Sequence, residues 1–266
     1  MNPSSVAGSA RVRLGHSDLT VRPVGLGCMG MSQFYGAADD SHSIDTIRAA
    51  LDLGVNFLDT SDVYGAADIR WGVTIRGFGD NEELIGTALA GRRDDVVLAT
   101  KFAAKIDDDR TGIMIDGRPD YVRAACEDSL RRLRTDVIDL YYYHRLDRSV
   151  PIEDDAAFVQ GDIRATNPRF SGENLRSNLQ PVDSLVALAQ EKGCRAGQLA
   201  LAWLLAQPLD VVPIPGTRRA EYVRENVDAT NVAISIDEIA YLSEVFARNR
   251  IVGERYAAVH AQTVER

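Results

Sequence analysis

Short apolar runs alternate with amphipathic segments through the first half of the chain. The runs at residues 55–58, 96–102 and 137–144 have the composition of buried strands. Helices are predicted at residues 41–53, after Asp80, which forms a capping-box pattern with Glu83, and after Pro119. Because strands that alternate with helices form right-handed βαβ units, this pattern predicts a parallel sheet in an α/β fold.

The flanking segments are less regular. Runs at residues 11–14 and 19–22 around a polar turn predict a small N-terminal hairpin, and residues 103–117 are predicted as a polar loop. After His144 the chain is polar and turn-rich up to residue 180. The remaining predicted elements are helices at 182–192, 196–207, 221–228 and 236–247, the last behind a capping box of Ser235 and Glu238, and a strand at 211–215.

Polar side chains follow the predicted strands. Asp59 and Tyr64 follow the first, whereas Lys101 and His144 lie at the ends of the next two. Since the C-terminal ends of parallel strands share one face, these four residues are expected to converge. Lysine stabilises a tyrosinate, an aspartate holds the lysine charged, and a histidine can hydrogen-bond a carbonyl. The set suits proton delivery to a carbonyl oxygen as hydride arrives, and since no side chain donates hydride, it implies a nicotinamide cofactor.

Several motifs in the same order resemble the aldo/keto reductase superfamily, and lie closest to its bacterial and plant members that begin with GLGCMGMS. They are GLGCMGMS at 25–32, NFLDTSDVYG at 56–65, NEELIG at 81–86, ATKF at 99–102, DLYYYHRLD at 139–147, RATNPRF at 164–170 and VPIPGTRRAEYVREN at 212–226. The resemblance implies a (β/α)8 barrel that uses NADPH to reduce aldehydes or ketones. It also implies that Tyr64 is the general acid, that Lys101 and Asp59 tune it, and that His144 orients the carbonyl.

The last predicted strand leads directly into Gly216, Thr217 and Arg218. A glycine permits close approach of the backbone to a ligand, and an arginine offers a bidentate fork to phosphate. By the resemblance this turn holds the 2'-phosphate of NADPH, while Glu225 and Asn226 contact adenine. Arg218 therefore favours NADP over NAD.

The chain departs from the family pattern in its middle. Apart from the hairpin, five strand-like runs are present, at 23–27, 55–58, 96–102, 137–144 and 211–215, whereas the family's barrel has eight strands. The sequence passes near residues 155–156 from the family's strand-four motif to its segment after strand seven. We therefore expect an incomplete barrel with an N-terminal β-hairpin, in which strands five to seven are missing. A disordered tail at 1–10 and a single domain at 11–266, truncated near 155–160, are predicted. Unpaired strand edges favour self-association.

Composition excludes several other classes of protein. The formal net charge of −9 over 266 residues disfavours nucleic-acid binding, and no apolar run approaches the roughly 20 residues of a membrane helix. Three widely spaced cysteines without a CxxC pair argue against disulfides and against a structural zinc site, so no metal and a cytoplasmic location are expected.

Other interpretations of the same residues stay open. Gly25, Gly27 and Gly30 satisfy a GxGxxG pattern, but a polar loop rather than a helix follows them, which disfavours a Rossmann fold. Cys28 is expected to be a buried thiol, and the tyrosines at 141–143 are expected to pack within their strand. The alternative function is a catalytically impaired relative that binds nucleotide or acts as an interaction protein.

Overall fold

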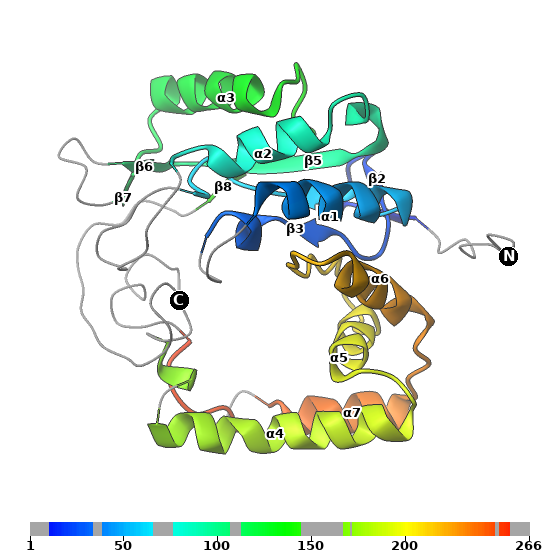
Figure 1. The fold of residues 1–266 in the computed structure, drawn as a ribbon. Coiled ribbons are helices and arrows are strands. Elements are labelled where there is room, and N and C mark those ends of the chain that lie inside the picture. Colours follow the sequence, from blue (N-terminus) through cyan, green and yellow to red (C-terminus); the bar gives the residue numbers. More distant parts are fainter. Residues whose placement is uncertain are drawn as a thin grey trace, which may run out of the picture.

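The structure, a computed structural model, describes residues 11–33, 39–65, 77–106, 113–144, 167–170, 172–247 and 250–255. Its centre is a parallel four-stranded sheet with the order β3-β4-β5-β8 (Figure 1). The strands are β3 (Leu26–Gly27), β4 (Phe57–Asp59), β5 (Val97–Phe102) and β8 (Leu140–Tyr143). The four strands lie side by side in the order in which they occur along the chain, as expected of successive βαβ units.

Three helices cover the outer face of this sheet, as predicted. They are α1 (Asp40–Asp52), α2 (Asp80–Ala88) and α3 (Pro119–Leu133). Leu26, Leu58 and Leu98 from three adjacent strands pack with Ile47 of α1 and Ile85 of α2 in the largest cluster of buried side chains. Burial of such a continuous apolar layer is the main favourable contribution to folding of this half.

The predicted capping box at Asp80 is wrong. The N-cap of α2 is Gly79, which has φ +85°, and Asp80 is the first helical residue. Glycine adopts this left-handed conformation at little cost, and a Cβ at this position would lie 2.2 Å from Cδ of Arg132. The chain therefore enters α2 through a glycine turn, and Asp80 places its charge in the favourable first turn of the helix.

The N-terminal hairpin covers the inner face of the sheet at the N-terminal ends of its strands. Strands β1 (Val12–Arg13) and β2 (Thr20–Val21) pair in antiparallel register, which confirms the predicted hairpin. Val21 packs with Phe57, Val97 and Ala99 in a second buried cluster. This apolar cluster does not include the residues at the C-terminal ends of the strands, where the polar side chains of the candidate site lie.

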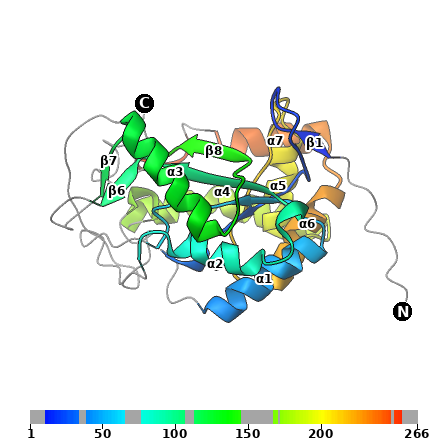
Figure 2. The ribbon, with the colours of Figure 1, turned by 90° about the horizontal axis from the view of Figure 1, so that it is seen from above.

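The polar loop predicted at residues 103–117 contains a second hairpin. Strands β6 (Ala104–Ile106) and β7 (Ile113–Ile115) pair in antiparallel register. Each strand is only three residues long, too short for its alternation to stand out from a polar surrounding. Its two strands lie side by side at one end of the molecule (Figure 2), and Ala104 of β6 packs with Val63 and Tyr64.

Four helices form the C-terminal half: α4 (Gly172–Glu191), α5 (Ala196–Leu205), α6 (Ala220–Asp228) and α7 (Ile236–Val245), the last with the predicted capping box. Short 3-10 turns occur at Met29–Met31, Arg93–Asp95, Pro168–Phe170 and Ala229–Asn231. Helix α4 starts ten residues before its predicted start and contains Pro181. Asn174 and Asn178, which look like turn residues in sequence, donate to the carbonyls of Pro168 and Arg169, so tertiary hydrogen bonds use them inside a helix.

The predicted last strand lies beside β3 without forming a regular ladder. The Gly25 and Gly27 amides donate to the carbonyls of Pro213 and Pro215, at 2.9 and 3.4 Å, and Gly27 bridges Gly216 in parallel. Pro213 and Pro215 have no N–H to donate in return, which explains why this segment forms no regular strand ladder with β3. The sheet therefore runs from this extended segment through β3 to β8.

The sheet does not close into a barrel among the described residues, where β8 pairs only with β5. The helices contact one another in the sequence α3, α2, α1, α6, α5, α4 and form an arc from the sheet to α4 and α7 (Figure 1). This is an α/β fold of incomplete (β/α)8-barrel type, as predicted. Residues 1–10 and the junction at 155–160 lie outside the described residues. None of the described helices is long and apolar enough to cross a membrane.

Candidate active site

The strand ends place the predicted residues in one row. Gly216 bridges Gly27, Gly27 pairs with Asp59, and Asp59 pairs with Ala99, two residues before Lys101. Gly27 must be a glycine, because a Cβ there would lie 2.7 Å from the Ile214 carbonyl oxygen. The predicted catalytic residues and the predicted nucleotide-binding turn thus lie along the same edge of the sheet, at the C-terminal ends of its strands.

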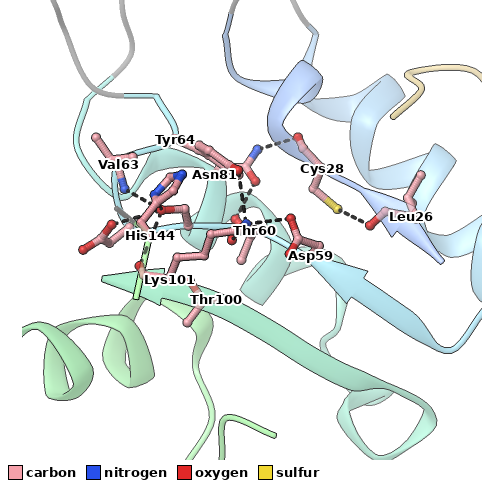
Figure 3. A network of polar contacts seen from close by, with 12 residues as sticks. Leu26, Cys28, Asp59, Thr60, Val63, Tyr64, Asn81, Thr100, Lys101 and His144 are labelled. Carbon is pink, nitrogen blue, oxygen red and sulfur yellow. Dashed lines mark hydrogen bonds and ion pairs between the residues drawn. The ribbon is translucent and has the colours of Figure 1, made fainter. Parts of the chain in front are cut away.

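Lys101 is the centre of the candidate site (Figure 3). Its ammonium nitrogen lies 2.6 Å from Oδ1 of Asp59, 2.7 Å from the Thr60 carbonyl oxygen and 3.1 Å from the Tyr64 hydroxyl. The Lys101 and Asp59 side chains are only 15% and 8% exposed. Three acceptors match the three ammonium hydrogens, so the lysine is held in one orientation against Tyr64.

His144 completes the group from the end of β8. Its backbone N–H donates to the Phe102 carbonyl, and its ring lies edge-on to the Tyr64 ring with centroids 5.7 Å apart. Nδ1 of His144 is 2.9 Å from the Ser61 hydroxyl oxygen. The structure therefore brings all four of the predicted catalytic residues together.

Burial and neighbouring charges shift the pKa values of Tyr64 and Lys101 in opposite directions. Burial raises the pKa of Tyr64, and the Lys101 ammonium offsets only part of that rise. Burial lowers the pKa of Lys101, but Tyr64 and Asp59 outweigh it and the net direction is upward. The phenol therefore keeps its proton at neutral pH, while the lysine stays positive and ready to stabilise a tyrosinate.

The buried side-chain amide of Asn81 connects the segments that carry the site, a role that was not predicted from the sequence. Asn81, at the start of α2, accepts from the Thr60 hydroxyl at 2.7 Å and donates to the Cys28 carbonyl at 3.0 Å and to Ser32 at 2.8 Å. These bonds join α2 to the ends of β3 and β4. Asn81 is fully buried, so each satisfied bond avoids a large desolvation cost.

Asp62 is a second residue that sequence reasoning missed, although it lies inside the NFLDTSDVYG motif. It is fully buried; its Oδ1 lies 3.1 Å from the Ser61 hydroxyl oxygen, within hydrogen-bond distance, whereas Oδ2 has no hydrogen-bond partner among the described residues. Burial, followed by the Glu82 carboxylate, raises the pKa of Asp62 to about 8. The carboxyl is therefore largely neutral at pH 7.

This shift makes stability depend on pH, and Asp62→Asn removes the dependence. The pKa rises from 3.8 in the unfolded chain to about 8 on folding. Between these values the folded state keeps a proton that the unfolded state has lost. The stabilisation is therefore complete below the unfolded pKa and is lost as pH rises, by up to about 1.4 kcal/mol per pH unit.

Urea unfolding of wild type and Asp62→Asn across that interval measures the effect. The free energy of unfolding of the variant is expected to increase relative to that of wild type as pH rises, because asparagine carries no proton to lose. Glu83→Gln, a change at an exposed carboxylate on α2, is the control and should run parallel to wild type. Parallel curves for Asp62→Asn would contradict the prediction.

The residues predicted to bind the nucleotide lie in the turn before α6 and, in the case of Glu225 and Asn226, on α6 itself. The Thr217 hydroxyl accepts from the Arg219 N–H at 3.2 Å just before the helix begins, and the Thr46 hydroxyl of α1 donates to the Arg218 carbonyl at 3.0 Å. Glu225 pairs with Arg195 at 3.0 Å, so its carboxylate already has a structural partner. The exposed Gly216, the turn and the helix N-terminus together present N–H donors that suit a phosphate.

The remaining sequence-based interpretations have clear outcomes. A 3-10 turn rather than an α-helix follows Gly27, which excludes the Rossmann interpretation. Cys28 is fully buried, as predicted, and burial raises its pKa to about 12. Tyr141 and Tyr143 pack on Phe102 at centroid distances of 4.8 and 5.0 Å. Tyr142 is the exception, because it pairs with Lys101 in register and faces the same side of the sheet.

Solved structures and a curated relative resemble this chain over most of its length. Glycerol dehydrogenase AKR11B4 from Gluconobacter oxydans has a TM-score of 0.72 at 23% identity and covers 90% of this chain and 96% of its own. Aldo-keto reductase AKR11C1 from Bacillus halodurans has a TM-score of 0.62 at 23% identity and covers 97% and 100%. These likenesses establish the fold.

The curated relative is aldo-keto reductase yakc [NADP(+)] of Schizosaccharomyces pombe, 29% identical over 326 residues, which cover 89% of this chain and 92% of the relative. That alignment is longer than the 266 residues of this chain, so the relative has residues without a counterpart here. The sequence model of the Aldo/keto reductase family matches in two parts, residues 23–165 and 156–247. Together they span more than half of the chain, which therefore belongs to the aldo/keto reductase family.

Proposed function

We propose that this protein is an NADPH-dependent oxidoreductase that reduces aldehydes or ketones to alcohols. The observation that carries the proposal is the position of the Lys101 ammonium, 2.6 Å from the Asp59 carboxylate and 3.1 Å from the Tyr64 hydroxyl. A buried phenol beside a fixed cation is a proton donor whose product anion is stabilised where it forms. Such a donor suits an oxygen that gains negative charge during reduction.

Each of the four residues has a separate task in this mechanism. NADPH, when bound, supplies the hydride that reaches the carbonyl carbon. Tyr64 transfers its hydroxyl proton to the carbonyl oxygen, and Lys101 stabilises the resulting tyrosinate. Asp59 keeps Lys101 charged and oriented, and His144 donates a hydrogen bond that holds the carbonyl oxygen near Tyr64.

The turn that leads into α6 supports the choice of cofactor. Gly216, Thr217 and Arg218 combine an exposed glycine backbone, a hydroxyl and a guanidinium beside a helix N-terminus, a donor set that suits the 2'-phosphate of NADPH. Glu225 and Asn226, farther along α6, are the proposed adenine contacts. The yakc relative carries NADP(+) in its name, and a Klebsiella pneumoniae aldo/keto reductase at TM-score 0.56 was solved with NADP and acetate.

Arg218→Ala is expected to weaken NADPH binding about 10- to 100-fold and to leave NADH binding nearly unchanged. The reason is that only NADPH carries the 2'-phosphate, and a charge-assisted bond to phosphate contributes about 1.5–3 kcal/mol. Fluorescence titration with both nucleotides measures this. Arg224→Ala, an exposed change on the same helix, is the control. An equal loss for NADH would show that Arg218 acts through structure instead.

The proposed activity is tested by following NADPH absorbance with an aromatic aldehyde. Turnover with 2'-phosphate-dependent binding supports the proposal. Tight NADPH binding without turnover of any aldehyde or ketone would refute it and favour the impaired, nucleotide-binding relative.

The wider setting is also proposed. Residues 11–266 are taken as one domain, because α1 of the first half contacts α6 of the second. All three cysteines are unpaired thiols, which supports a reducing, cytoplasmic location. Self-association through the edges of the sheet stays a prediction, which sedimentation of the purified protein measures.

A further inference from the structure

A line of polar contacts leads from His144 to a buried carboxyl that the proposed mechanism does not use. Nδ1 of His144 lies 2.9 Å from the Ser61 hydroxyl oxygen, and that oxygen lies 3.1 Å from Oδ1 of Asp62. Ser61 and Asp62 are both fully buried. The Lys101 carbonyl, the other acceptor near the Ser61 hydroxyl, is farther away at 3.4 Å.

The surroundings of Asp62 favour its neutral form. Its Oδ2 has no hydrogen-bond partner among the described residues, and an ionised oxygen left unpaired in the interior is costly. Arg132 could neutralise it, but the guanidinium already bonds Glu82 at 2.7 Å. The titratable or charged groups that interact with Asp62 from the elements around it are Glu82 on α2, Arg132 and Tyr121 on α3, and Tyr141 on β8.

The state of Asp62 decides which way the Ser61 proton points, because a hydroxyl has only one proton. An ionised Asp62 only accepts, so Ser61 donates to it and Nδ1 of neutral His144 must donate to Ser61. A protonated Asp62 can donate to Ser61, which then donates to Nδ1. In that second state the proton of the neutral imidazole is on Nε2.

We propose that Asp62 is a positioning residue that acts through Ser61 to keep His144 in its Nε2–H tautomer. Only this tautomer of the neutral ring turns a donor away from Ser61 and can serve a carbonyl oxygen, which accepts and does not donate. The benefit for catalysis rests on the proposed carbonyl reduction. The tautomer of His144 does not depend on the proposed function, because it is a property of the protein without substrate or cofactor.

The direct test is a two-dimensional proton–nitrogen spectrum of protein labelled with ¹⁵N-histidine, recorded without nucleotide. The chain has four histidines, so a His144→Gln spectrum identifies the signals of His144. In wild type the neutral His144 ring is expected to be the Nε2–H tautomer at pH 7 and to convert to the Nδ1–H tautomer at about pH 8, where Asp62 ionises. Asp62→Asn keeps an N–H donor facing Ser61 and should hold Nε2–H at high pH.

Controls and kinetics separate this inference from the proposed function. Glu83→Gln should reproduce the wild-type spectra. With an aldehyde, wild-type kcat/KM is expected to fall about tenfold above about pH 8, and Asp62→Asn should remove that fall. A protein without turnover but with the expected spectra loses only the proposed function. Nδ1–H at pH 7, or the same titration in wild type and Asp62→Asn, overturns the role of Asp62.

Discussion

Tyr64→Phe is expected to lower kcat for carbonyl reduction by about 10²- to 10⁴-fold, the usual contribution of a general acid. The Tyr64 hydroxyl is the proposed proton donor and lies 3.1 Å from the Lys101 ammonium, and phenylalanine removes it without changing the shape of the ring. Lys101 keeps its bonds to Asp59 and the Thr60 carbonyl, so the rest of the site should stay in place. NADPH binding is expected to change little.

Initial rates of NADPH consumption with an aldehyde measure this loss, and a thermal unfolding scan verifies that the variant folds. Tyr241→Phe, which removes the hydroxyl of an exposed tyrosine on α7, is the matched control and should keep wild-type kcat. If Tyr64→Phe stays within about fivefold of wild type, Tyr64 is not the general acid.

Arg132→Met is expected to lower the free energy of unfolding by about 3–5 kcal/mol, the cost of breaking a buried ion pair on one side. Glu82 is fully buried, and its two oxygens lie 2.7 Å from Nε of Arg132 and 2.6 Å from the Thr100 hydroxyl. Without the guanidinium, the Glu82 carboxylate keeps only a neutral donor and lies near Asp62. This pair joins α2 and α3 to β5, so its loss should destabilise the framework of the site.

Urea unfolding provides the comparison, with Arg131→Met as control. Arg131 is the residue before Arg132 on α3, and its side chain is 70% exposed. Among the described residues it forms an ion pair with the half-exposed Asp128, so its loss should cost less than about 1 kcal/mol. Removing both charges with Arg132→Met and Glu82→Gln should recover part of the loss, since no buried charge is then left unpaired. Equal losses for Arg132→Met and Arg131→Met would contradict this account.

Local patterns predicted most elements of the fold, and failed where tertiary contacts decide. Apolar periodicity was sufficient for α1, α2, α3 and the strands between them, because those residues bury one continuous layer. It missed the start of α4, whose asparagines bond a distant segment, and the short hairpin after β5. The local pattern also predicted a capping box at the start of α2, whereas the N-cap of that helix is Gly79, a left-handed glycine beside Arg132.

The candidate site divides in the same way. Asp59, Tyr64, Lys101 and His144 follow from the sequence, because strand ends in a parallel sheet meet at one edge and the residue types suit proton transfer to a carbonyl. Asp62, Asn81 and the Arg132–Glu82 pair do not follow, because nothing in their local sequence shows that they are buried or what they contact.

By itself the sequence determined which side chains gather at one edge of a parallel sheet, that the chain lacks runs for three strands of its family's barrel, and that a hairpin precedes the first strand. Only the tertiary structure decided that the strands form an open sheet within the described part of the chain, with the carbonyls of Pro213 and Pro215 accepting from the Gly25 and Gly27 amides at one edge and β8 at the other. It also decided the charge state of the site, since burial raises the pKa of Tyr64 against the effect of Lys101. Burial and dielectric surroundings depend on every element packed around a group, and these arise only when the whole chain has folded.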